Sequence, residues 1–393
     1  MRRELVIAAG PGEWRAALLE GGVAVELRVE RGDGAEAGSI HLGRVLRLLP
    51  ALGAALVDIG GDRPGFLPHS ELLPRGRRLD EGERVVVQVR REAQGGKAAR
   101  LTTDIKSSSR PLELICDCAA RSDPPTRLDP AAGFATALAG VLPMPDRLVI
   151  DEPGAIPELR AAFPVAEIAH QPEGDWPVDL GALLDEALSP TLALAGGGSV
   201  HFEATRAATM IDVDSGTPET GSPERGALAV DLAAALLIAR QARLRNLGGG
   251  IVVDFIGLDD RRARERVRAA LAGALAADPA RPQLLGWTRL GHFELVRPRR
   301  TRPLAETLLE PGATGAQVKS ALTVALEALR AVRREDRAQP GRRWQLIAAP
   351  EVAAALAGDG ATARRGLEQR LGREIAITAD PQHDRAGFEI FPV

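Results

Sequence analysis

The segment between residues 224 and 258 constrains the fold of this chain most strongly. From Glu224 to Arg245 apolar residues recur at helical spacing, at Leu228, Leu232, Ala235, Leu236 and Ala239. Asn246 and the glycines at 248–250 then end the predicted helix. The next segment, IVVDFIGL, is apolar almost throughout, which is typical of a strand covered on both faces. A long helix followed directly by such a strand indicates an α/β architecture.

The residues on either side extend this unit. Two β-rich stretches precede it, LALAGGGSVHFEAT and AATMIDVDSG, and AGGGS at 195–199 is interpreted as a turn. An arginine-rich helix is predicted from Asp259 to Leu275, and LLGWTRLGHFELVRPRR closes the unit as a hairpin. After the helix breaker EPGATG, the pattern is helix, strand (RWQLIAA), helix, helix, strand (REIAITA) and strand (GFEIFPV). This last part is predicted to be a small separate α/β domain.

The first third of the chain has a different pattern. A strand from Glu4 to Ala8, a short amphipathic turn and a strand from Val23 to Val29 are predicted first. From Ser39, four or five short alternating segments separated by Gly, Pro and Asp predict a small closed barrel of the OB type, a fold that commonly carries oligonucleotides. The residues from Arg110 to Asp146 are interpreted as a connector with one short helix, Phe134 to Leu142, and DRLVIDE then resumes as a strand.

Composition excludes several classes. Fifty basic against 53 acidic residues leave a formal net charge of −3, so the total charge does not indicate a nucleic-acid-binding protein. Uncharged apolar runs fall short of a membrane span, and the first residues lack the apolar core of a secretory signal. The two cysteines, Cys116 and Cys118, cannot build a zinc site unaided and are expected to be reduced thiols. A cytoplasmic location is therefore predicted.

Three carboxylates carry the strongest chemical signal. Asp212 and Asp214 in TMIDVDSG share one face of a predicted strand because side chains alternate along a strand. Asp254 lies within the apolar segment IVVDFIG, where a charge is costly unless it is paired or binds a metal. Carboxylates on two neighbouring strands make an oxygen site suited to Mg²⁺. The alternative is that they cap strand ends or pair with Arg243 or Arg245.

Basic and aromatic residues suggest a phosphate-binding surface. Arginines cluster at Arg240, Arg243 and Arg245 and again at Arg297, Arg299, Arg300 and Arg302, and their planar guanidinium groups suit phosphate. They could equally decorate a solvated surface. In the predicted barrel, Phe66 is a candidate base-stacking residue and Lys97 a candidate phosphate contact, although a single Phe is more often part of a core. The six histidines are scattered without metal-ligand spacing.

Several segments resemble one family. IARQARLRNLGGGIVVDFIGL is similar to the signature of the ribonuclease E/G family, and AATMIDVDSG resembles the strand that precedes it there. SIHLGRVLRLLPALGAALVDIGGDRPGFL, with GKAARLTTDI after it, resembles the inserted S-one-type OB barrel of that family, and RRELVIAA its first strand.

The resemblance implies a Mg²⁺-dependent endoribonuclease, with Mn²⁺ as an alternative ion, that cuts single-stranded, AU-rich RNA in rRNA or mRNA processing or decay and leaves 5′-phosphate ends. Asp212 and Asp254 match the family's metal-binding aspartates, Asp214 follows as a third catalytic residue, and Phe66 and Lys97 match its RNA contacts. Arg243, Arg245, Arg297 and Arg299 are expected to help hold the RNA. The alternative is a diverged RNA-binding module with weak or no nuclease activity.

The same resemblance implies a domain layout. The expected parts are an RNase H-like subdomain (1–35 and 147–198), the barrel (36–109), a connector in place of the family's 5′ sensor (110–146), a DNase I-like catalytic subdomain (199–308) and a small C-terminal α/β domain (309–393).

The chain also departs from the family pattern. Asp214 stands where the family has asparagine, Leu56 where it has a second RNA-facing aromatic, and Arg206 where it has glutamate. The shortened connector predicts indifference to the phosphorylation state of the RNA 5′ end. TLLEPGATG replaces the family's zinc-link, so no zinc is expected, and a homodimer would form without a zinc bridge. No membrane partner is expected.

Overall fold

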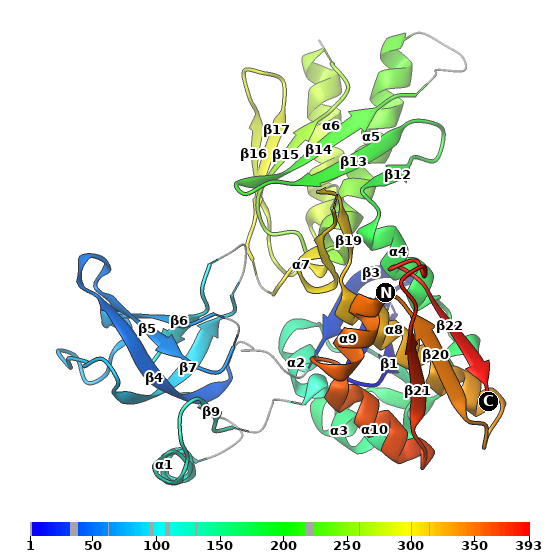
Figure 1. Ribbon diagram of the computed structural model, residues 1–393. Helices are drawn as coiled ribbons and strands as arrows, with labels where there is room; N and C mark the ends of the chain where they lie inside the picture. Colours follow the sequence, from blue (N-terminus) through cyan, green and yellow to red (C-terminus); the bar gives the residue numbers. More distant parts are fainter. Residues whose placement is uncertain are drawn as a thin grey trace. The chain divides into compact units, whose positions relative to one another are not determined.

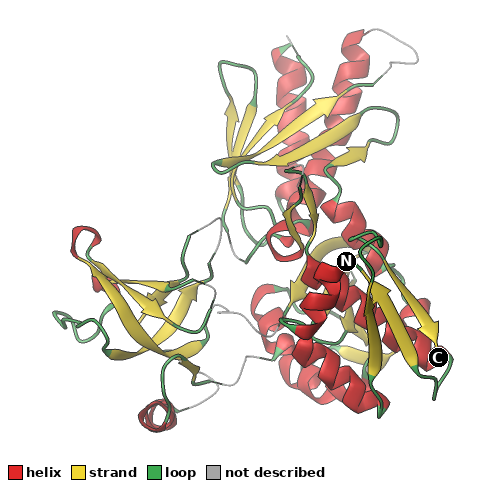
Figure 2. Ribbon diagram, viewed as in Figure 1, coloured by secondary structure: helices red, strands yellow, loops and turns green. Residues whose placement is uncertain are grey.

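The computed structural model describes residues 2–31, 38–61, 63–93, 97–106, 111–129, 133–216, 223–258, 260–299, 301–313 and 315–393, without the side chains of 223–225 (Figure 1). The chain divides into two compact units. One comprises Met1–Val29, Pro145–Gly154 and Val165–Val393, and the other comprises Glu30–Met144 and Ala155–Pro164. Both mix strands with helices, as the sequence predicts (Figure 2).

The second unit contains the predicted barrel. Its five strands are β4 (Ile40–Leu49), β5 (Ala54–Asp58), β6 (Gly65–Pro68), β7 (Arg84–Arg91) and β8 (Arg100–Thr102). They pair in the order β5-β6-β8-β7-β4, and a β4–β5 pairing closes the ring. Alternate residues such as Val57, Leu67, Val87 and Leu101 fill the interior. A closed five-stranded barrel of this kind is compatible with an OB-fold.

The expected connector is partly regular structure that belongs to the barrel's unit. Strand β9 (Thr126–Arg127) pairs with β4, and helices α1 (Leu112–Arg121), α2 (Phe134–Val141) and α3 (Ile156–Ala162) accompany it. Ile115 of α1, one turn before Ala119, packs with Ile40 of β4. The sequence did not indicate α1 because only these two buried positions mark its apolar face.

The first unit begins with a five-stranded sheet in the order β11-β10-β1-β2-β3. Its strands are β1 (Arg3–Ala9), β2 (Trp14–Glu20), β3 (Val23–Glu30), β10 (Arg147–Ile150) and β11 (Glu167–His170). The prediction of an amphipathic turn between the first two strands was wrong, because that segment is β2. Its residues Arg15 to Leu19 are all buried, so it lacks the alternation that marks a half-exposed strand.

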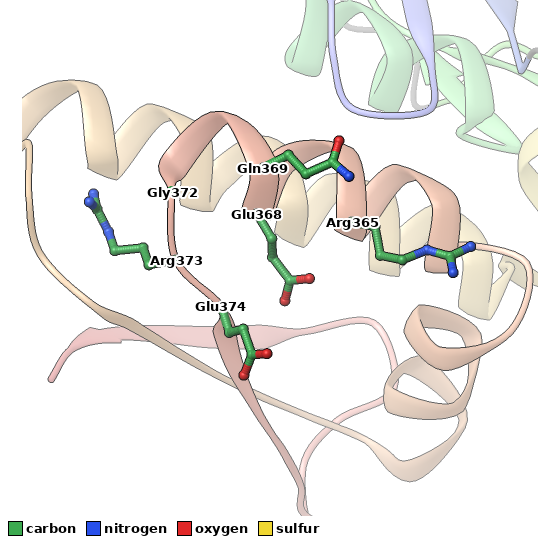
Figure 3. Close-up of a pocket in the computed structure, with 6 residues that line it drawn as sticks. All are labelled: Arg365, Glu368, Gln369, Gly372, Arg373 and Glu374. Atoms are coloured by element: carbon green, nitrogen blue, oxygen red, sulfur yellow. The ribbon is translucent and has the colours of Figure 1, made fainter.

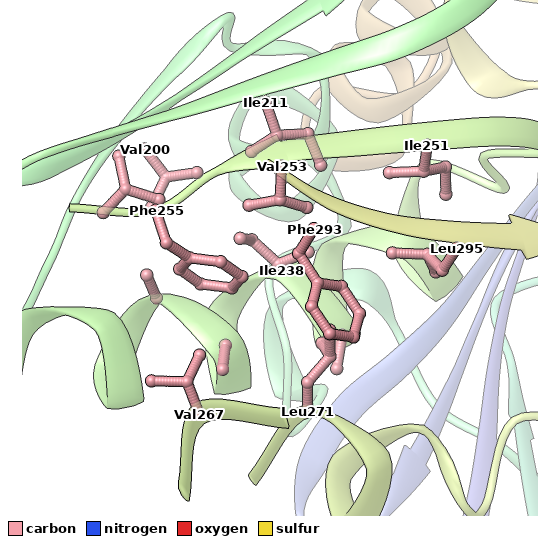
Figure 4. Packing of buried hydrophobic residues seen from close by; sticks show 14 of the residues in the cluster. Val200, Ile211, Ile238, Ile251, Val253, Phe255, Val267, Leu271, Phe293 and Leu295 are labelled. Carbon is pink, nitrogen blue, oxygen red and sulfur yellow. The ribbon is translucent and has the colours of Figure 1, made fainter. Parts of the chain in front are cut away.

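The sheet that carries the candidate site has the order β12-β13-β14-β15-β17-β16. Its strands are β12 (Thr191–Ala193), β13 (Ser199–Ala204), β14 (Ala208–Asp214), β15 (Gly249–Asp254), β16 (Gln283–Trp287) and β17 (Phe293–Arg297). Helices α5 (Pro223–Leu244) and α6 (Arg261–Leu275) cover one face (Figure 1). Ile211, Val253 and Phe293 of the strands meet Ile238 of α5 and Leu271 of α6 in the core (Figure 4). The predicted start of α6, Asp259, lies outside the described residues.

The C-terminal elements follow the predicted order. They are α8 (Ala321–Ala338), β20 (Trp344–Ala348), α9 (Pro350–Ala357), α10 (Ala361–Leu371), β21 (Ile375–Ala379) and β22 (Phe388–Pro392), after a short α7 (Leu304–Leu308) and the hairpin β18 (Leu309–Pro311) and β19 (Gln317–Lys319). They lie in the same compact unit as the first sheet. Arg333 of α8 donates to the carbonyl of Ala9 and pairs with the buried Asp151 after β10. Periodicity in the sequence does not indicate such contacts between distant segments.

Helix α4 (Leu180–Leu188) completes the first unit, and the Asp179 side chain caps its start by accepting from the amides of Gly181 and Ala182. Within the described part of the chain, no helix combines the length and the apolar character needed to cross a membrane.

Candidate functional site

Asp212 and Asp254 lie side by side at the ends of neighbouring strands. β14 and β15 run parallel, and Asp212 is the register partner of Asp254. Both side chains point to the face that α5 and α6 leave open, because the alternate residues Ile211, Val213 and Val253 point into the core. The Asp254 side chain is 54% exposed. The prediction that β15 is covered on both faces was therefore wrong.

Two histidines flank the aspartates. His201 on β13 is the register partner of Asp212 across the antiparallel pair. Its Nδ1 lies 2.8 Å from Thr191 Oγ1 and its Nε2 lies 3.1 Å from Ser199 Oγ. On the other side, His292 Nε2 lies 3.6 Å from Asp254 Oδ2. The order across the open face is thus His201, Asp212, Asp254, His292. Neither histidine could be assigned to the site from local sequence patterns, since their placement depends on strand pairing.

Asp214 shares the open face with Asp212 and also ends the strand. Its Oδ1 accepts a hydrogen bond of 3.0 Å from the amide of Gly216. Its backbone passes close to the turn between β12 and β13, where Gly198 has φ +87° and a Cβ would stand 2.4 Å from the Asp214 carbonyl oxygen. Only glycine fits there, so the segment AGGGS is a turn, as predicted.

The donor set on this face suits a hard divalent ion. Within the described residues no group of three or more Asp, Glu, His or Cys side chains is arranged to hold a metal. Two adjacent, accessible carboxylates nevertheless match Mg²⁺, which keeps several water ligands and binds through one or two carboxylates together with substrate phosphates. Asp212 and Asp254 therefore fit such an ion without a closed protein cage.

The arginines at the end of α5 are committed to the interior. The Arg243 side chain is 5% exposed, and its Nε donates to Glu26 Oε1 at 3.1 Å. Arg245 donates to Gln241 Oε1 and to the Ser189 carbonyl oxygen, and stacks over the Phe202 ring. Burial lowers the pKa of Arg245 to about 10. Neither residue pairs with the aspartates, and the guanidinium groups of both are bonded inside the fold.

The second arginine cluster is divided. Arg297 is 2% exposed and makes two bonds to Asp278, with its Nε 2.7 Å from Oδ2 and its Nη2 3.2 Å from Oδ1. Its guanidinium group, like those of Arg243 and Arg245, is bonded inside the fold. Arg299 is exposed and uses its Nε to donate to the Gly248 carbonyl oxygen. Arg300 lies outside the described residues. Of the four arginines predicted to hold RNA, only Arg299 remains accessible.

On the barrel, the strand that carries Phe66 lies beside the segment that follows Lys97. Phe66 on β6 is half-buried, and its amide donates to the Ala99 carbonyl oxygen, two residues beyond the exposed Lys97. Leu56 is the register partner of Phe66 on β5, and Arg100 is its partner on β8. The row Leu56, Phe66, Arg100 is therefore an outward-facing strip with one aromatic ring and one exposed cation, and Phe66 is not a core residue.

The pocket in Figure 3 lies elsewhere. It is a shallow depression of about 340 Å³ at the end of α10, lined by Arg365, Glu368, Gln369, Gly372, Arg373 and Glu374. None of these residues belongs to the sheet with the aspartates. The aspartate pair is instead on an open surface, as a site for a long polymer requires.

The chain is similar to known proteins of one family. The profile of the Ribonuclease E/G family matches residues 75–300, more than half of the chain. Ribonuclease G of Salmonella typhimurium is 27% identical, and ribonuclease G of Escherichia coli K12 is 26% identical, each alignment covering 99% of this chain and 99% of the relative. Ribonuclease E of Escherichia coli K12 is 26% identical over 100% of this chain and 46% of its own length.

These matches define a nucleic-acid-cutting hydrolase. The chain belongs to the ribonuclease E/G family and is an endoribonuclease. The alignment with the Salmonella protein spans 489 positions, whereas this chain has 393 residues, so the relative carries segments that this chain lacks.

Proposed function

We propose that this protein is a Mg²⁺-dependent endoribonuclease that cuts single-stranded, AU-rich RNA in rRNA or mRNA processing or decay and leaves 5′-phosphate ends. Mn²⁺ is the alternative ion. The observation that carries the proposal is the register pairing of Asp212 with Asp254 on the open face of the sheet.

Each residue has a distinct role in this proposal. Asp212 and Asp254 hold the ion, which when bound neutralises charge on the scissile phosphate and activates water. Asp214 orients the end of β14 through its bond to the Gly216 amide. Phe66 stacks on a base and Lys97 contacts a phosphate, as ring and ammonium groups do in single-strand-binding barrels. Arg299 contributes a phosphate contact on the catalytic unit.

The finer architecture follows the same proposal. The sheet of β1–β3, β10 and β11 corresponds to the RNase H-like part, the barrel to the S-one-type OB domain, and the sheet of β12–β17 to the DNase I-like part. We propose a cytoplasmic location, no zinc requirement, and a homodimer without a zinc bridge.

Cleavage of a labelled single-stranded AU-rich RNA tests the proposal, with Mg²⁺ or with EDTA. Wild type should cut only with the metal, and Asp254→Asn and Asp212→Asn should not cut. Glu203→Gln is the matched control. Glu203 is an exposed carboxylate on β13, on the same open face of the sheet, where it is the register partner of Met210. Cleavage that persists in EDTA would contradict the metal mechanism. Binding without any cleavage would favour the RNA-binding module instead.

A further inference from the structure

A buried carboxylate on α5 contacts the loop that leaves the site. Asp231 is 0% exposed and lies on the helix face that packs against the sheet. Its Oδ1 accepts a hydrogen bond of 2.9 Å from the amide of Ile256, two residues after Asp254. Its Oδ2 is buried and has no hydrogen-bond partner among the residues that the structure describes. Burial raises the pKa of Asp231 to about 7, although the Ile256 amide favours the charged form.

This arrangement is unfavourable for stability alone. A carboxylate oxygen without a partner in an apolar core destabilises the folded state, and a leucine or alanine would pack there without that penalty. The neighbours of Asp231 are apolar, with Leu232 and Ala235 on the same helix in the same core. The side chain's bond to the Ile256 amide, its one hydrogen bond among the described residues, is therefore what Asp231 adds.

That bond fixes the backbone immediately beyond Asp254. On its near side, the Phe255 ring is buried against Trp287 and Phe293, with ring centroids 5.7 and 6.4 Å apart. On its far side, Arg264 Nε donates to the Leu258 carbonyl oxygen at 2.6 Å. Without Asp231, the Ile256 amide would lose its anchor between these two points. The backbone that follows Asp254 would then be free to move, and the position of the Asp254 side chain would be less well defined.

We propose that Asp231 is a positioning residue that holds Asp254 beside Asp212 by anchoring the Ile256 amide. The inference rests on the proposed function, because it assumes that the aspartate pair binds a divalent ion. The proposal predicts that the metal affinity of Asp212 and Asp254 depends on an acceptor oxygen at residue 231 and not on a charge there. Residue 231 is not itself a metal ligand.

Mn²⁺ binding by the full-length protein, measured by electron paramagnetic resonance, tests this. Asp231→Asn keeps the acceptor oxygen and should bind Mn²⁺ within about threefold of wild type. Asp231→Leu removes the acceptor and should bind at least about tenfold more weakly, in the range found when a partner of a metal ligand is lost. Leu271→Ala is the control: it opens the same core from α6 but leaves both partners of the Asp231–Ile256 bond unchanged, and should lose stability but keep its Mn²⁺ affinity.

Hydrogen exchange at the Ile256 amide gives a second readout that needs no metal. Protection should persist in Asp231→Asn and fall in Asp231→Leu, or in Asp231→Ala if the leucine variant does not fold. Wild-type affinity in the folded Leu or Ala variant would overturn the positioning role and leave the proposed function intact. Failure of wild type itself to bind Mn²⁺ would overturn the proposed function, and the positioning role with it.

Discussion

Arg297 and Asp278 form a two-point ion pair inside the unit that carries Asp212 and Asp254, with Nε and Nη2 of the arginine each bonded to one carboxylate oxygen. The pair links the end of β17 to the segment after α6, and Arg297 also donates to the Leu247 carbonyl oxygen before β15. Arg297 thus joins three segments of the fold.

Replacement of this arginine should affect folding first. Arg297→Ala leaves Asp278 buried without its partner, and removing one member of a buried pair costs about 3–5 kcal/mol. Arg299→Ala, at an exposed position two residues away, should change the free energy of unfolding by no more than about 0.5 kcal/mol. Urea denaturation measures both. An Arg297→Ala protein as stable as wild type but weakened in RNA binding would contradict the structural role.

The three aspartates of the site should differ in their importance. Asp212→Asn and Asp254→Asn remove one charge from the proposed ion site and should lower the cleavage rate by at least ~100-fold. Asp214→Asn keeps an oxygen that can accept from the Gly216 amide, so its rate should stay within about tenfold of wild type. Initial rates over a Mg²⁺ titration measure all three. Equal losses would place Asp214 among the ion's ligands.

The outward strip of the barrel should respond to its aromatic content. Phe66→Ala should weaken single-stranded RNA binding by about 1–3 kcal/mol, the contribution of one stacked base. Leu56→Phe places a second ring beside Phe66, its register partner, and should strengthen binding. Fluorescence anisotropy in EDTA measures affinity without cleavage. If neither variant shifts the affinity, RNA does not stack on this strip.

Asp231 should make stability depend on pH. Its pKa is about 7 in the fold against an ordinary value of 3.8, so between these values the unfolded chain has released a proton that the folded chain retains. Wild-type stability therefore falls as pH rises from about 4 to about 7. Asp231→Asn removes this dependence, and its advantage in melting temperature over wild type should be larger at pH 8 than at pH 4. An advantage that is constant with pH would exclude the buried carboxyl as its source.

The short segment between β8 and β10 should leave the enzyme insensitive to the 5′ end of its substrate. Two RNAs of identical sequence, one with a 5′ monophosphate and one with a 5′ triphosphate, should be cut at equal rates. A large preference for the monophosphate would show that α1, α2 or their surroundings form a phosphate pocket.

Local patterns predicted much of the fold. The helix α5 and strand β15 were predicted from apolar spacing and the glycines at 248–250, and the barrel was predicted from alternation and turn residues. β2 was missed because both of its faces are buried. The two histidines beside the aspartates, the burial of Arg243 and the one-sided exposure of β15 all depend on which strand lies next to which. Pairing between distant segments leaves no local trace in the sequence, so only the structure reveals it.

The first sheet has a consequence for synthesis of the chain. The amide of Arg3 in β1 bonds to the Asp146 side chain, 143 residues later, and the carbonyl of Ala9 accepts from Arg333, 324 residues later. The barrel strands lie between β1 and β10 in the sequence, so they are synthesised before β10, and until then β1 has only β2 as a neighbour in the sheet. The buried Asp151 gains its arginine only when α8 has been made. The contacts of the first sheet are thus completed only after α8 has been made. A polypeptide that ends before α8 would leave the Ala9 carbonyl and the Asp151 carboxylate without Arg333.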